Sequence, residues 1–157
     1  MSIFEVRGGI KLTGDVTAQG AKNEALQIIS AVLLTADEVV VNNIPDIIDV
    51  NLLIELLQEM NVKVNRIDRH TCSFKADDVN VEYLQSESYH KKSGRLRGSV
   101  MLAGPLLARF KKAYLPKPGG DKIGRRRLDT HIIGFEKLGA NFNYDDHTGF
   151  FKLEAAE

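Results

Sequence analysis

This 157-residue sequence contains no Trp, and its only cysteine is Cys72. A single cysteine excludes an internal disulfide framework and a zinc site built from several cysteines. The longest nearly apolar stretch, residues 28–34, is interrupted by Ser30 and is far shorter than the ~20 residues that a membrane helix needs. Neither the GxGxxG pattern nor the P-loop pattern occurs, which argues against a Rossmann or P-loop nucleotide site.

The N-terminus also lacks the marks of an export signal. Met1 to Glu5 carry an early acidic residue, without a basic region or a small-residue cleavage site. We therefore expect a cytoplasmic protein that does not enter a membrane. A chain of about 150 residues can bury roughly 68–70% of its unfolded surface, which is enough for one core and for one or two small domains.

The sequence also has no net charge, because 21 basic residues balance 21 acidic ones. The balance hides a segregation: residues 89–127 hold twelve basic residues and one acidic residue, Asp121, and so carry a charge of +11. Such a segment indicates an anionic partner, either nucleic acid or a phosphorylated small molecule, and the alternative is a solvated basic face. Its three aromatic residues do not show the interleaving that is typical of single-stranded nucleic-acid binding.

A repeated pattern of elements runs through the chain. Apolar residues in 22–34 follow helical spacing, and residues 38–41 form a β-branched run that predicts a strand. A second helical pattern follows, for which Asp46 and Asp49 are candidate N-terminal caps. Two strands at 62–65 and 71–76 then form a hairpin.

About 75 residues later the same order returns. We predict a helix from residue 97 to about 109, a strand at 113–115, a helix at 128–138 and two strands at 140–144 and 150–153. Pro105 predicts a kink or an early end in the first of these helices. The second copy differs by about four extra residues in 118–127, and a loop that interrupts a repeat is a usual place for binding chemistry.

Three stretches carry a resemblance to a known family. They are Gly-Ala-Lys-Asn at 20–23, Leu-Arg-Gly-Ser at 96–99 with Gly-Pro-Leu-Leu-Ala-Arg at 104–109, and Pro-Gly-Gly-Asp-Lys-Ile-Gly-Arg-Arg at 118–126. In this order they resemble the first part of the UDP-N-acetylglucosamine 1-carboxyvinyltransferases, which are enolpyruvyl transferases of early peptidoglycan synthesis. The similarity runs through essentially the whole chain.

The resemblance implies a fold and a division of the chain. The family has an inside-out α/β barrel, in which each of two domains contains three repeated helix and strand units, with the active site between the domains. We therefore expect residues 1–21 to be a strand segment that packs in the second domain, 22–88 to be the first unit, and 89–157 to be the second unit, with a catalytic loop at 116–127. On this reading the chain is a fragment that does not turn over by itself, and its open face allows a homodimer.

The resemblance also implies two anionic substrates and no metal or cofactor. The family transfers the enolpyruvyl group of phosphoenolpyruvate to the 3′-hydroxyl of UDP-N-acetylglucosamine and releases phosphate. Lys22 and Asn23 match the residues that hold phosphoenolpyruvate, with Lys22 also stabilising charge, and Arg97 matches an arginine that reaches the substrates. The stretch that matches the binding site for the uridine end comprises Arg126, Arg127, Leu128, Asp129 and Thr130.

Two positions depart from the family pattern. Arg127 stands where proline is common, and Asp121 stands where many members have a cysteine that acts as general acid and is alkylated by fosfomycin. A carboxyl group can donate a proton if a neighbouring anion or desolvation raises its pKa. We therefore expect Asp121 to be the proton donor and the enzyme to resist fosfomycin.

Each of these residues also has a plain structural interpretation. Lys22 can be a solvated first-turn lysine, Arg97 a surface ion-pair partner, and the Asp121 loop a tight turn. We interpret His131 as an ordinary satisfied histidine and Cys72 as a small buried hydrophobic residue. Two other functions stay open at this point: a 5-enolpyruvylshikimate-3-phosphate synthase-like transferase, and a non-catalytic module that binds anions or RNA.

Overall fold

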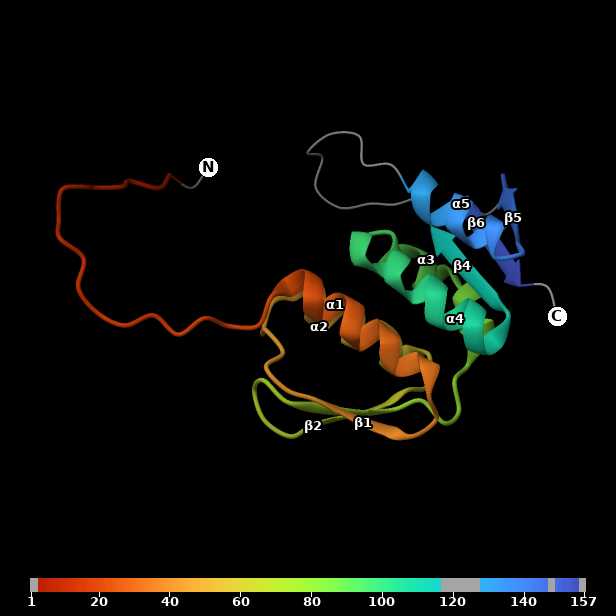
Figure 1. The fold of residues 1–157 in the computed structure, drawn as a ribbon, viewed down its shortest axis with the longest axis horizontal. Helices are drawn as coiled ribbons and strands as arrows, with labels where there is room; N and C mark the ends of the chain where they lie inside the picture. Colours follow the sequence, from red (N-terminus) through yellow and green to blue (C-terminus); the bar gives the residue numbers. More distant parts are fainter. Residues whose placement is uncertain (1–2, 117–127, 147–148, 156–157) are drawn as a thin grey trace.

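The computed structural model describes residues 3–116, 128–146 and 149–155, and it shows a mixed α/β fold in which one pattern of elements occurs twice (Figure 1). Each copy contains a strand, a helix and two further strands, and these strands form a three-stranded antiparallel sheet. The last strand of each copy lies in the middle of its sheet, so that the orders are β1-β3-β2 and β4-β6-β5. The predicted repeat is confirmed at the level of topology.

The first half follows the sequence prediction closely. Its elements are α1 (Lys22–Ala31), the 3₁₀ helix η1 (Val32–Leu34), β1 (Glu38–Val41), α2 (Ile48–Glu59), β2 (Lys63–Arg66) and β3 (Cys72–Lys75). The predicted caps of α2 are wrong, because Ile47 occupies the N-cap and makes no side-chain cap hydrogen bond. The side chain of Asp46 instead accepts hydrogen bonds from Asn51 and Arg69, and Asp49 pairs with Lys22.

The second half contains the remaining elements. They are η2 (Val81–Gln85), α3 (Glu87–Ser93), η3 (Arg97–Leu102), α4 (Ala103–Phe110), β4 (Lys112–Pro116), α5 (Asp129–Lys137), β5 (Ala140–Asp145) and β6 (Phe150–Ala155). The helices η2 and α3 were not predicted. α3 spans the expected unit boundary at residue 88, and the division of the chain into units stays a prediction.

The helix predicted from residue 97 to about 109 is two helices. Residues 97–102 form the 3₁₀ helix η3, and the α-helical hydrogen bonds begin with α4 at Ala103. The change therefore comes before Pro105 rather than at it. Pro105 lies in the first turn of α4, where a backbone N–H has no partner within the helix, so the proline ring is tolerated there.

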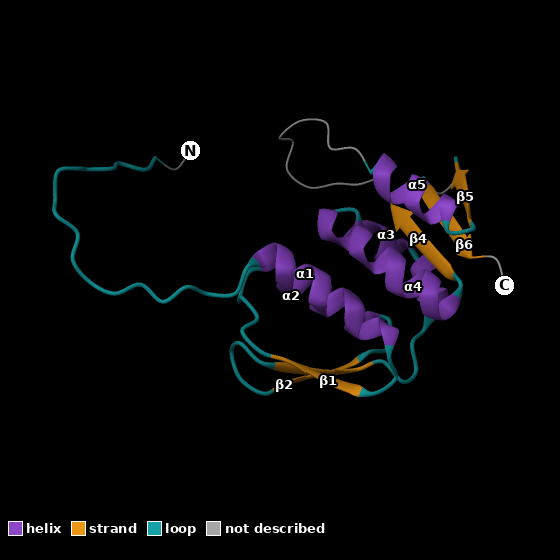
Figure 2. Cartoon of the chain, in the orientation of Figure 1, coloured by secondary structure: helices purple, strands orange, loops and turns teal. Residues whose placement is uncertain are grey.

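The core is formed mainly by helices. In the view of Figure 2, α1 to α4 lie between the β1-β3-β2 sheet and the β4-β6-β5 sheet. Tyr89 of α3 is fully buried, and its hydroxyl donates a hydrogen bond of 3.1 Å to the carbonyl of Tyr114 in β4. The other largest fully buried side chains are those of Ile29, Leu33, Leu53, Leu56, Leu57, Met60, Phe74, Leu84, Leu96, Leu102 and Leu106.

Most of the residues before α1 lie apart from this core. Residues 3–19 form no helix or strand, and Figure 1 shows this segment leading away from the body of the molecule. Their packing in a second domain stays a prediction. Within the described ranges, no helix is both long and apolar enough to cross a lipid bilayer.

Candidate functional site

The two halves of the chain meet around a cavity of about 340 Å³. Four of the residues predicted for the site line it: Lys22 and Asn23 at the start of α1, Arg97 at the start of η3, and Leu128 just before α5. The other lining residues are Leu26, Gln27, Asp49, Gly98, Val100, Met101 and His131. Side chains predicted from separate motifs are thus brought together in one place.

Two glycines let the elements around the cavity approach closely. A Cβ atom on Gly20 would lie 1.9 Å from the carbonyl oxygen of Asn43, so only glycine fits against this loop just before α1. A Cβ atom on Gly98 would lie 2.7 Å from Cδ1 of Leu26 in α1. Because Arg97 precedes Gly98, the close packing of η3 on α1 brings Arg97 and Lys22 to the same cavity.

The cavity combines positive charge with one carboxylate. The Nζ atom of Lys22 donates to Oδ2 of Asp49 at 2.6 Å, and about half of each side chain is exposed. Lys22 and Asn23 occupy the first two positions of α1, which has no side-chain cap at its N-terminus. The first amides of a helix favour anions, so the lysine, the arginine and the helix end together favour an anionic ligand.

The remaining predicted site residues fall into two groups. Asp129 and Thr130 begin α5, directly between the lining residues Leu128 and His131. Asp121, Arg126 and Arg127 lie outside the described residues. Their roles, like those of the lining residues, stay predictions.

Asp49 is a site residue for which the sequence predicts a different role. Its position in the first turn of α2 gave a reason to expect a cap, and nothing in the sequence connects it with a lysine in another helix. His131 also lines the cavity, and its interpretation as an ordinary satisfied histidine stays a prediction.

The basic residues of 89–116, the described part of the basic segment, do not all face the cavity. Among its described members, only Arg97 lines the cavity. Lys92 pairs with Glu55 and, at 2.6 Å, with Glu59 of α2. Arg109 donates hydrogen bonds of 3.0 and 2.9 Å to the carbonyls of Leu33 and Thr35. Part of the positive charge therefore holds the two halves of the structure together.

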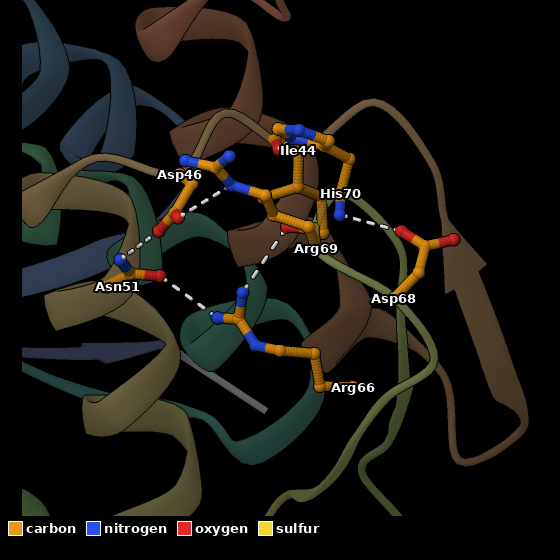
Figure 3. Close-up of polar contacts among 7 residues, drawn as sticks. All are labelled: Ile44, Asp46, Asn51, Arg66, Asp68, Arg69 and His70. Carbon is orange, nitrogen blue, oxygen red and sulfur yellow. Dashed lines mark hydrogen bonds and ion pairs between the residues drawn. The ribbon is translucent and has the colours of Figure 1, made fainter.

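A group of residues joined by polar contacts beside the cavity supports the first turn of α2. This hairpin cluster consists of Ile44, Asp46, Asn51, Arg66, Asp68, Arg69 and His70 (Figure 3). Asp46 accepts hydrogen bonds from Nδ2 of Asn51 at 3.0 Å and from Nε of Arg69 at 3.2 Å. The bond from Asn51, and then that from Arg69, lowers the pKa of the Asp46 carboxyl. The cluster thus ties the turn between β2 and β3 to α2.

A solved structure and a family model relate the chain to a defined class of proteins. Its structure resembles that of the enolpyruvyl transferase NikO from Streptomyces tendae, with a TM-score of 0.73 at 21% identity over 96% of this chain and 32% of that one. At this identity the likeness concerns the fold. The chain belongs to the EPSP synthase (3-phosphoshikimate 1-carboxyvinyltransferase) family, whose model matches residues 6–156.

Closer relatives carry a different name within this family. The chain is 57% identical over 155 residues to the UDP-N-acetylglucosamine 1-carboxyvinyltransferase of Bacteroides thetaiotaomicron, covering 99% of the chain and 36% of that protein. It is 58% identical over 156 residues to the protein of the same name from Porphyromonas gingivalis, with the same coverage. The chain spans 36% of the length of these curated relatives, and the predicted resemblance is confirmed.

Proposed function

We propose that the chain forms part of a UDP-N-acetylglucosamine 1-carboxyvinyltransferase. This enzyme would transfer the enolpyruvyl group of phosphoenolpyruvate to the 3′-hydroxyl of the UDP-sugar and release phosphate, in the cytoplasm, as an early step of peptidoglycan synthesis. The observation that carries the proposal is that Lys22, Asn23, Arg97 and Leu128, predicted from separate motifs, line one cavity. Relatives of that name at 57–58% identity support it.

The chemistry explains why cations are needed at this site. Both substrates are highly anionic, and lysine supplies a compact charge while arginine binds phosphate with a planar fork. In the proposed reaction the sugar hydroxyl gives up its proton to a general base as its oxygen attacks C2 of phosphoenolpyruvate, and C3 gains a proton from a general acid. The resulting tetrahedral adduct then loses phosphate, together with a proton from C3. Lys22 would hold the phosphate and stabilise the charge that develops, with Asn23 beside it.

The other roles follow the resemblance. Arg97 would reach both substrates, and Arg126, Arg127, Leu128, Asp129 and Thr130 would hold the uridine end. Asp121 would donate the proton to C3, in place of the usual thiol. In the whole enzyme we propose that these units belong to an inside-out α/β barrel.

Phosphate release tests this function in the natural protein that contains these residues. We expect release from phosphoenolpyruvate only when UDP-N-acetylglucosamine is also present. Lys22→Met should lower kcat/KM by about 100-fold or more, as loss of a group that stabilises developing charge does. Lys63→Met is the matched control, because Lys63 pairs with Asp77 on an exposed hairpin and does not line the cavity. Release with 3-phosphoshikimate instead of the UDP-sugar would refute the assignment in favour of the other family activity.

Fosfomycin provides a separate test of Asp121. The unsubstituted protein should remain unlabelled, and Asp121→Cys should become labelled at that residue in a mass spectrum of its peptides. Covalent labelling of the unsubstituted loop would contradict the proposed role of Asp121.

A further inference from the structure

We propose that Asp49, held in place by the hairpin cluster, is a positioning residue that keeps the Lys22 ammonium at the cavity. The inference rests on the proposed function for its kinetic consequence, and on the described contacts for its structural part. The residues of the β2–β3 turn support Asp49 but do not line the cavity themselves.

The first connection runs through the first turn of α2. Nη2 of Arg66 donates to Oδ1 of Asn51 at 3.0 Å, and Nδ2 of Asn51 donates to Asp46 at 3.0 Å (Figure 3). The backbone N–H of Asn51 also donates to the carbonyl of Ile47, the N-cap of α2, at 3.0 Å. These contacts fix the residues before and after Asp49 in the chain. The carboxylate oxygen Oδ2 of Asp49 lies 2.6 Å from Nζ of Lys22.

The second connection runs through the loop that supports the start of α1. The backbone N–H of Ile44 donates to the carbonyl of His70 at 2.8 Å, and the His70 ring bonds the carbonyl of Ile44 at 2.9 Å (Figure 3). Asn43, the preceding residue, is the one whose carbonyl oxygen leaves no room for a Cβ atom on Gly20. The same turn therefore fixes the backbone beneath Lys22 and the carboxylate that its ammonium contacts.

Lys22 needs such positioning because it has open space on two sides. Lys22 and Asp49 line both the cavity and a second, more open groove, which is also bordered by Asp46, Ile47, Ile48 and Asn51. A lysine side chain has four flexible carbons, so a half-exposed ammonium without a partner samples many rotamers. The carboxylate of Asp49 selects the rotamers in which the ammonium lies between the two hollows.

The first measurement uses this chain without substrate. Nuclear magnetic relaxation of the Lys22 side chain should show a lower order parameter in Asp49→Asn and in Asn51→Ala, and recovery in Asp49→Glu. Asp77→Asn is the matched control, because Asp77 accepts from Lys63 and Lys75 at the other end of the same hairpin. Circular dichroism should show that each variant is folded. Equal order of Lys22 in Asp49→Asn and in the unsubstituted chain would overturn the proposal.

The second measurement uses the natural protein that contains the chain. A misplacement of about 1 Å can cost about 100-fold in rate, so we expect kcat/KM for phosphoenolpyruvate to fall roughly 10- to 100-fold in Asp49→Asn. The fall should be smaller in Asn51→Ala, and KM for the UDP-sugar should stay constant. Loss of thermal stability with unchanged kinetics would show a merely structural role and overturn the proposal. Absence of turnover in the unsubstituted protein would refute the proposed function, and the relaxation result would then decide the positioning by itself.

Discussion

The close contact at Gly20 provides the sharpest test of how the site is built. Substituting Gly20→Ala places a Cβ atom 1.9 Å from the carbonyl oxygen of Asn43 and 3.1 Å from Cδ of Pro45. Gly20 does not have a positive φ, so the alanine backbone is not itself strained. The clash is with backbone atoms rather than with a side chain that could rotate away.

The expected cost follows from the displacement that the clash requires. Real Cβ atoms stay at least 3.0 Å from such neighbours, so the start of α1 and the loop at Asn43 must separate by about 1 Å. Overpacking of this kind costs about 1–3 kcal/mol. For a chain of this size each kcal/mol lowers Tm by about 2–4 °C.

Urea unfolding followed by circular dichroism measures the change in the free energy of unfolding. Gly134→Ala is the matched control, because Gly134 lies within α5 with no atom near its missing Cβ. Alanine should stabilise that helix by about 0.5–1 kcal/mol. If Gly20→Ala is as stable as the unsubstituted chain while Gly134→Ala shows its gain, the proposed packing at the start of α1 is wrong.

Three further predictions concern contacts outside the cavity. Arg109→Met removes the hydrogen bonds to the carbonyls of Leu33 and Thr35 and should cost about 1.5 kcal/mol in thermal unfolding, whereas a cost near zero would show that water replaces them. Tyr89→Phe leaves a backbone carbonyl in β4 without its donor and should cost about 1 kcal/mol in urea, and equal midpoints would refute that role. Burial acts to raise the pKa of Glu59, but hydrogen bonds from Lys92 and Tyr83 lower it overall, so its ionised form stabilises the fold above the usual pKa of 4.5. Glu59→Gln should therefore be less stable at pH 7, and the difference should shrink as the pH falls below about 4.5; a difference independent of pH would contradict this.

The sequence was sufficient for the elements with a strong local pattern. The β-branched run at 38–41 and the helical spacing of apolar residues in 22–34 predicted β1, α1 and η1 because local preference and packing agree there. The two helices η2 and α3 were missed. α3 has only seven residues, most of them polar, and it depends on the burial of Tyr89 and on the Ser86 cap.

The candidate site was predicted in part for a similar reason. Lys22, Asn23, Arg97 and Leu128 belong to stretches that resemble a known family, and the structure brings them together. The ion pair of Lys22 with Asp49 depends on how α1 and α2 pack, and single-sequence patterns contain no information on that distance. Composition also does not show which cations of the basic segment, such as Lys92 and Arg109, have intramolecular partners.

The central position of β3 and β6 in their sheets has a consequence for biosynthesis. A ribosome produces the two outer strands of each sheet first, and neither has a neighbour to pair with until the final strand emerges. Each half must therefore wait for its last residues before its sheet can close, and a nascent chain that stops before Cys72 leaves β1 and β2 without the strand with which both pair.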